Sequence, residues 1–149
     1  MIAFVMTLFT LAIPGWASAV VTVDFSRGEI RELASLEREG AVYVMAAELA
    51  GLFSGKLSWS PEKRKLVVNL GEGDIVFMAD NPYAMAGQTD INLILSPFLE
   101  NGNLYVWLPG LAPWLDTLLP ERLTWDAEKR TLYVKSSDTL IRRFSVEEK

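Results

Sequence analysis

The sequence predicts an α+β domain in which most strands pair antiparallel and two short helices pack against them. Two observations lead to this prediction. Short segments of alternating apolar and polar residues recur along the chain, separated by turn residues such as Glu39-Gly40 and Asp80-Asn81-Pro82. One pattern, a strand followed by a helix and a hairpin, also occurs twice, at about residues 42–69 and 104–135. Two copies indicate one intertwined domain, because solenoids need at least three repeats.

Each copy carries an apolar stretch with helical spacing. In the first copy Leu49, Leu52 and Phe53 have this spacing, and Gly55 is placed to end the helix. The second copy keeps the spacing but contains two prolines and a glycine that disfavour an early start, so we expect its helix to begin late, near Pro113. These residues are Leu111, Leu115 and Leu118, with Pro109, Gly110 and Pro113.

Each copy also contains a hairpin with a Leu-x-Trp motif. Leu57-Ser58-Trp59 leads into a polar turn and a return strand at 66–68, and Leu123-Thr124-Trp125 leads into the turn 126–129 and a return strand at 132–134. Apolar alternation predicts further strands, for a total of about eight to ten. Their expected bounds are 20–25, 28–36, 41–44, 75–78, 83–85 and 91–95.

The chain ends are expected to lie outside the domain. Residues 2–13 are almost wholly apolar, which is too short for a bilayer-spanning helix, and Ala17-Ser18-Ala19 supplies the small residues of a cleavage site. Residues 1–19 are therefore interpreted as a signal peptide cleaved after Ala19. No transmembrane segment is expected after its removal. The domain is expected to span residues 20–135, and residues 136–149 are read as a polar tail or linker.

Composition excludes several classes of function. The 149 residues contain no cysteine and no histidine, which removes thiol nucleophiles, Ser-His-Asp chemistry and histidine-ligated zinc or copper. The net charge of −5 disfavours a general nucleic-acid binder. No carboxylate pair has a spacing that singles it out for glycoside hydrolysis, and Gly71-Glu72-Gly73 lacks the helix and third glycine of a dinucleotide site. We expect no catalytic residues, no metal and no cofactor.

The duplicated Leu-x-Trp hairpins, each followed by Lys-Arg and a Leu-x-Val-type strand, resemble the copper amine oxidase-like N-terminal domain, a module of secreted bacterial proteins. The resemblance covers roughly residues 42–134. The sequence is also similar to the N-terminal region of some exported cell-wall N-acetylmuramoyl-L-alanine amidases. Family members often have Pro-Leu-Arg after Tyr-Val, whereas this chain has Met45-Ala46-Ala47 and Trp107-Leu108-Pro109. The resemblance implies an accessory, stalk-like module, because the copper or zinc chemistry of such proteins belongs to another domain.

The tryptophans allow structural and functional interpretations. Trp59 and Trp125 occupy equivalent positions in the two copies, which favours rings that close the core beside their own helices over rings that stack on sugars. Trp107 and Trp114 differ from their counterparts in the first copy. Together with Tyr83 and Tyr105 they could line a shallow groove for peptidoglycan or a partner protein, although ordinary packing under an irregular helix start is the favoured alternative.

Three functional hypotheses follow. The first is a non-catalytic exported module of the cell envelope that binds or positions peptidoglycan or another envelope protein. The second is the accessory region of a cell-wall amidase whose zinc domain is missing from this chain. The third is a structural module that self-associates through exposed strand edges. The sequence leaves the ligand and the oligomeric state open.

Overall fold

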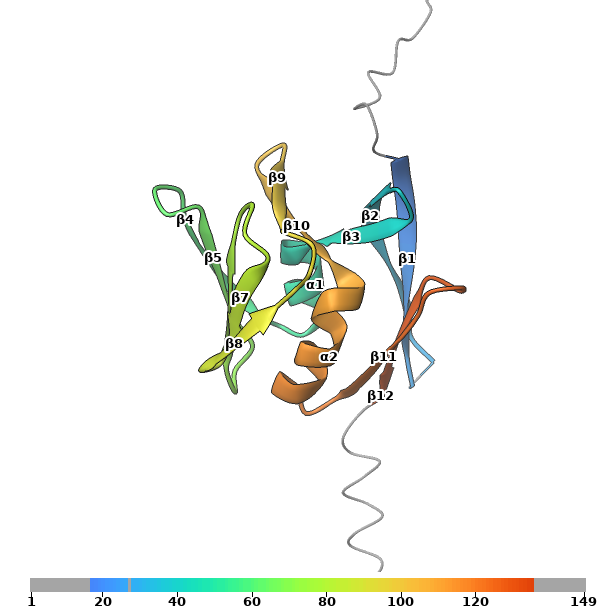
Figure 1. Ribbon diagram of the computed structural model, residues 1–149. Helices are drawn as coiled ribbons and strands as arrows, with labels where there is room; N and C mark the ends of the chain where they lie inside the picture. The colour runs from blue at the N-terminus through green and yellow to red at the C-terminus, as the bar shows by residue number, and fades with distance from the viewer. Residues whose placement is uncertain (1–16, 27, 136–149) are drawn as a thin grey trace, which may run out of the picture.

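The computed structural model describes residues 17–26 and 28–135, which form twelve strands and two helices (Figure 1). An α+β fold is confirmed, with more strands than the eight to ten expected. In chain order the elements are β1 (Ala17–Phe25), β2 (Ile30–Arg38), β3 (Ala41–Met45), α1 (Ala46–Leu52), β4 (Lys56–Ser60), β5 (Lys65–Asn69), β6 (Asp74–Met78), β7 (Tyr83–Ala86), β8 (Thr89–Asn92), β9 (Phe98–Glu100), β10 (Asn103–Trp107), α2 (Leu108–Leu118), β11 (Arg122–Asp126) and β12 (Thr131–Lys135).

The strands form two sheets. The seven-stranded sheet has the order β11-β12-β1-β2-β3-β10-β9, and the five-stranded sheet has the order β4-β5-β6-β7-β8. All neighbouring strands pair antiparallel except β1 and β12, which pair parallel, with Thr22 opposite Thr131 and Phe25 opposite Val134. The prediction of a mainly antiparallel architecture is therefore confirmed.

The core lies between the two sheets, where both helices are placed (Figure 1). Strand alternation sends one face of each sheet inward, and the helices contribute Leu49, Leu108, Leu111 and Leu115 to the same buried cluster. At roughly 25 cal/mol for each Å² of apolar surface removed from water, this burial supplies the main driving force for folding.

The order strand, helix, hairpin occurs twice, as β3-α1-β4-β5 and as β10-α2-β11-β12. The two leading strands pair with each other antiparallel. Val44 lies opposite Val106, and Tyr43 and Tyr105 lie opposite Trp107 and Met45 respectively. The paired positions 43–45 and 105–107 are thus symmetric about the Val44–Val106 pair.

The expected late start of the second helix is wrong, because α2 begins at Leu108. Pro109 falls in the first turn, where a helix has no intrahelical partner for the backbone N–H and the fixed φ of proline suits the conformation. Pro113 stays inside the helix and removes one backbone hydrogen bond. Burial of Leu111, Ala112 and Leu115 offsets that loss.

The strand expected at 20–25 begins earlier, at Ala17, two other expected strands are shifted, and one strand was missed. The segment expected at 28–36 forms its strand at Ile30–Arg38, and the one expected at 91–95 forms it at Thr89–Asn92. The missed strand is β9, which pairs with β10 across a turn at Asn101-Gly102, where both residues have positive φ. Glycine adopts that conformation readily and asparagine is one of the few other residues that tolerate it.

The two Leu-x-Trp hairpins form with the same register but in different surroundings. Trp59 lies opposite Leu66 and Trp125 opposite Leu132. The expectation that Trp59 closes the core is wrong, since it is 40% exposed. Trp125 does pack against the core, but its indole N–H is buried without a hydrogen-bond partner rather than bonded to a carbonyl. The cause is helix length: α2 has 11 residues and covers β11, whereas α1 has 7 and leaves most of β4 open.

The proposed cleavage point after Ala19 falls inside β1. Residues 17–19 pair with Glu37, Leu36 and Ser35 of β2, while the parallel pairing with β12 begins only at Thr22. Cleavage after Ala19 would shorten β1 at its start and leave its pairing with β12 intact. Residues 1–16 of the expected signal peptide and the expected tail 136–149 lie outside the described residues.

Replacement of Gly110 by alanine is expected to destabilise the fold. A Cβ atom at Gly110 would lie 2.4 Å from the carbonyl oxygen of Leu93 and 2.8 Å from Cε3 of Trp107. The chain must shift to admit the methyl group, at a cost of about 1–3 kcal/mol in the free energy of unfolding, measurable by urea denaturation. Gly51→Ala in α1 is the matched control, because a Cβ there meets nothing within 4 Å. Equal stability of Gly110→Ala and wild type would contradict this close packing.

Candidate functional site

The candidate site is the aromatic face at the β3-β10-β9 end of the seven-stranded sheet. Along β10, Leu104 and Val106 are buried in the core, so the alternation of a strand places Tyr105 and Trp107 on the opposite face. Side chains two residues apart on one face of a strand are separated by about 7 Å. Both rings are partly exposed.

Neighbouring strands add two more rings. Tyr43 of β3 lies opposite Trp107, and Phe98 of β9 lies opposite Tyr105. The Phe98 ring stacks on Tyr105 with ring centroids 5.5 Å apart, and meets the edge of Tyr43 at 5.0 Å. These four residues, Tyr43, Phe98, Tyr105 and Trp107, are called the aromatic face below. Offset and edge-on ring contacts of this kind contribute about 0.5–1.5 kcal/mol beyond the burial of area.

Charged groups border the aromatic face. Burial raises the pKa of Tyr105, and the nearby carboxylates of Glu48 and Glu100 raise it further. Burial also raises the pKa of Tyr43, and Arg38 opposes that shift. Both tyrosines are protonated at neutral pH, and the hydroxyl of the partly exposed Tyr105 can donate as well as accept hydrogen bonds.

Glu48 links the first helix to the sheet. Its carboxylate oxygen Oε2 accepts a hydrogen bond from the backbone N–H of Ala34 at 3.1 Å. Ala34 lies in β2 next to Ser35, which pairs with Val44 near the end of β3. The Glu48 carboxylate thus pairs with the backbone N–H of Ala34 in β2 close to the junction of β3 and α1. This hydrogen bond fixes the start of α1 against the sheet, near Tyr105.

The sequence singled out Trp107, Trp114, Tyr83 and Tyr105, and the structure brings together only Tyr105 and Trp107. Trp114 lies on α2 and packs against the core. Tyr83 lies on β7 of the five-stranded sheet, 61% exposed, on the face opposite its buried neighbour Ala84. Within residues 17–26 and 28–135, neither Tyr83 nor Trp114 has a ring contact with the aromatic face.

Sequence reasoning missed Tyr43 and Phe98. Phe98 lies in the short strand β9, which the sequence pattern does not predict, and Tyr43 joins the site only through the pairing of β3 with β10. The turn signal Asn101-Gly102-Asn103 between two apolar segments was available and would have located β9 opposite β10.

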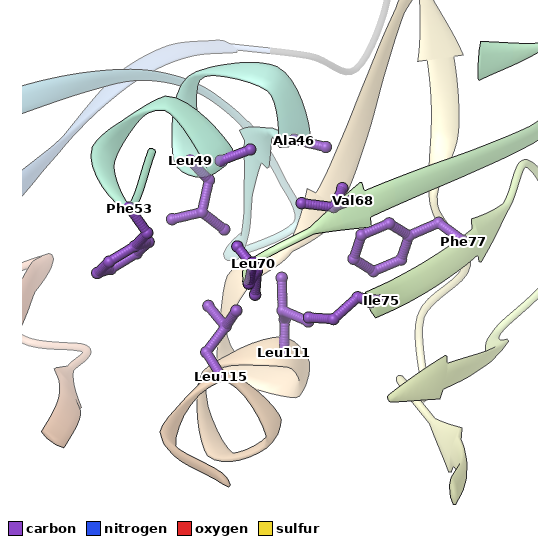
Figure 2. A pocket seen from close by; sticks show the side chains of 10 residues that line it. Ala46, Leu49, Phe53, Val68, Leu70, Ile75, Phe77, Leu111 and Leu115 are labelled. Carbon is purple, nitrogen blue, oxygen red and sulfur yellow. The ribbon is translucent and has the colours of Figure 1, made fainter. Parts of the chain in front are cut away.

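A small apolar cavity lies inside the domain, where side chains from α1, α2, β5 and β6 converge (Figure 2). Its volume is about 10 Å³, near the minimum that holds one water molecule, and its lining offers no side-chain hydrogen-bonding group. It is therefore a packing defect of the core and not a ligand site. The lining residues are Ala46, Leu49, Ala50, Phe53, Val68, Leu70, Ile75, Phe77, Leu111 and Leu115.

Residues 17–26 and 28–135 contain neither a metal-binding cluster nor a membrane-spanning helix. No group of three or more Asp or Glu side chains is placed to hold a metal ion in this part of the chain. Neither α1 nor α2 has the length and apolar character required of a membrane-crossing helix. The expectation that the chain carries no catalytic residue remains a prediction.

Two packed sheets enclosing two short helices, with rings gathered on one outer face, define an α+β domain. Residues 29–134 match the family described as Copper amine oxidase N-terminal domain, and the chain belongs to that family. The resemblance seen in the sequence is therefore confirmed. No curated protein and no solved structure matches the chain significantly.

The raised pKa of Tyr105 makes a pH-dependent prediction. A folded-state pKa above the unfolded value means that the neutral form is favoured by the fold, so this stabilisation is complete below the ordinary pKa of 10.0 and is lost as pH rises through the folded-state value. We expect the free energy of unfolding to fall as the pH rises above 10.0, and to fall less steeply in the Tyr105→Phe variant. Urea denaturation at a series of alkaline pH values measures both slopes.

Glu100→Gln tests the cause of the shift separately. Removing this carboxylate should lower the pKa of Tyr105, which can be followed by absorbance titration of the tyrosinate band. An unchanged titration in Glu100→Gln, or identical pH slopes for Tyr105→Phe and wild type, would contradict the assignment.

Proposed function

We propose that the chain is a non-catalytic exported module of the cell envelope that binds peptidoglycan or another envelope protein through the aromatic face. Membership of the Copper amine oxidase N-terminal domain family supports an accessory role. The absence of histidine and cysteine from the 149 residues supports a binding role rather than a catalytic one. Export is inferred from the apolar leader and the small residues Ala17-Ser18-Ala19.

The observation that carries the proposal is the pairing of flat rings with the protonated hydroxyl of Tyr105 on one sheet surface. Tyr105 and Trp107 lie side by side on β10, and Phe98 and Tyr43 support them from the neighbouring strands. A rigid ring can pack against the apolar C–H face of a sugar while a tyrosine hydroxyl bonds its hydroxyl groups. Tyrosine and tryptophan are also the residues most enriched at the energetic centres of protein interfaces.

The scaffold is well suited to hold such a surface still. The aromatic face is built on strands whose opposite side is packed in the core, with Leu104 and Val106 at most 5% exposed. Groups on rigid elements lose little conformational entropy on binding, so more of the contact energy appears as affinity. We further propose that the two strand-helix-hairpin segments descend from one duplicated unit, which the two-fold pairing of β3 with β10 supports.

The proposal can be tested by co-sedimentation of the chain with purified peptidoglycan sacculi. Tyr105→Leu combined with Trp107→Leu keeps apolar side chains on β10 but removes the flat rings and the hydroxyl. We expect the affinity for sacculi to fall about tenfold, since loss of a hot-spot aromatic typically costs more than 1 kcal/mol. Tyr83→Leu, on the other sheet, is the matched control and should leave binding unchanged.

Circular dichroism of each variant shows whether the fold is retained. Equal retention of the double variant and wild type by sacculi would remove the glycan version of the proposal. Loss of retention in Tyr83→Leu alone would assign the binding surface to the five-stranded sheet.

A further inference from the structure

Strand β4 is an edge strand that is open along its length. It pairs with β5 alone, at the end of the five-stranded sheet, and residues 56–59 are all exposed. In Figure 1 the β4-β5 hairpin projects at the left, away from the helices. Backbone N–H and C=O groups on an open edge can pair with another extended chain, and most proteins cover or shorten such edges.

The corresponding edge in the second hairpin is covered at Leu123. Leu123 of β11 is 8% exposed, and its backbone N–H donates to Oδ1 of Asp116 on α2 at 2.9 Å. Its counterpart Leu57 is 44% exposed. Because α1 ends at Leu52, none of its side chains accepts a hydrogen bond from the backbone of β4. The open edge is therefore a specific difference between the two halves.

The inward face of β4 carries two apolar side chains that extend cross-strand rows of the five-stranded sheet. Leu57 continues the row that contains Val68 and Ile75, and Trp59 continues the row that contains Leu66 and Phe77. In the inner strands these rows are buried, whereas Leu57 and Trp59 are 44% and 40% exposed. A further strand with apolar side chains on this face would complete both rows.

The opposite face of the hairpin is cationic. Lys56 lies on the same face as Ser60, and Lys65 lies directly opposite Ser60. Residues 56–65 contain four basic side chains and only one acidic one, Glu62, in a chain whose net charge is −5. Arg64 is paired with Asp80 at 2.8 Å, but Lys56 and Lys65 have no ion pair within the described part of the chain.

We propose that β4 accepts an extended anionic peptide by strand addition, so that the five-stranded sheet gains a sixth strand. Backbone hydrogen bonds along β4 supply the attachment, and alternate side chains supply the specificity. Apolar residues of the peptide lie beside Leu57 and Trp59, and its carboxylates lie on the other face near Lys56 and Lys65. A second copy of the chain fits this edge less well, because pairing two β4 strands brings two cationic hairpins together.

Fluorescence anisotropy with the full chain tests the proposal directly. The probe is a terminally blocked, labelled peptide of about eight residues that alternates glutamate and valine. We expect saturable binding that weakens as salt rises, since exposed charges are screened. Trp59→Ala, and separately the pair Lys56→Glu with Lys65→Glu, should each raise the Kd by about tenfold.

Matched controls separate strand addition from general attraction. Lys129→Glu with Lys135→Glu places the same charge change on the β11-β12 hairpin, and Tyr83→Ala removes an exposed ring from the same sheet. Both variants should bind the peptide like wild type. A peptide with proline in place of valine keeps its carboxylates but loses every second N–H, and it should not bind.

Four outcomes would overturn the proposal. These are no saturable binding, equal binding of the proline peptide, equal losses in the control variants, or a concentration-dependent dimer by sedimentation that depends on Trp59 without any peptide binding. The last outcome assigns the edge to a second copy. The proposal stands apart from the aromatic face, because Tyr105→Leu with Trp107→Leu leaves β4 intact and should leave peptide affinity unchanged.

Discussion

The rest of the fold depends on the pairing of β3 with β10. Val44 and Val106 face each other at its centre, and neither is exposed to solvent. Each strand runs directly into a helix, so this one pairing fixes where α1 and α2 start and how both lie on the seven-stranded sheet. It also sets the aromatic face, because the side of the two strands that turns away from the core carries Tyr43, Tyr105 and Trp107. A shift of one residue in the register would exchange the buried and outer sets.

The two strand-helix-hairpin segments differ in their packing because their helices differ in length. The longer α2 reaches β11, buries Leu123 and places Asp116 to accept its N–H, while the shorter α1 stops before β4. The same Leu-x-Trp motif therefore has a packing role in one hairpin and an exposed one in the other. The same motif gives both hairpins the same register, because register is set by the hairpin's own residues. The burial of each tryptophan depends on the helix packed beside it, which the motif does not determine.

Local patterns predicted the fold class, both hairpins, the first helix and the family. These features rest on alternation, turn residues and helical spacing, which a single sequence displays. The start of α2 could not be predicted from Pro109 and Pro113, because burial of Leu111 and Leu115 outweighs one lost hydrogen bond. Half of the aromatic face was found from Tyr105 and Trp107. Its other half, Tyr43 and Phe98, is assembled by cross-strand pairing that brings distant residues together, and that information is absent from local spacing.

The parallel pairing of β1 with β12 has a consequence for the order of folding. The first described strand needs the last one as its neighbour, with Thr22 opposite Thr131 and Val23 opposite Leu132. Contacts this far apart in the chain form slowly, because a long loop must close before they are made. A nascent chain cannot complete the seven-stranded sheet until β12 has been synthesised. The five-stranded sheet has no such requirement, because its last strand, β8, ends at Asn92.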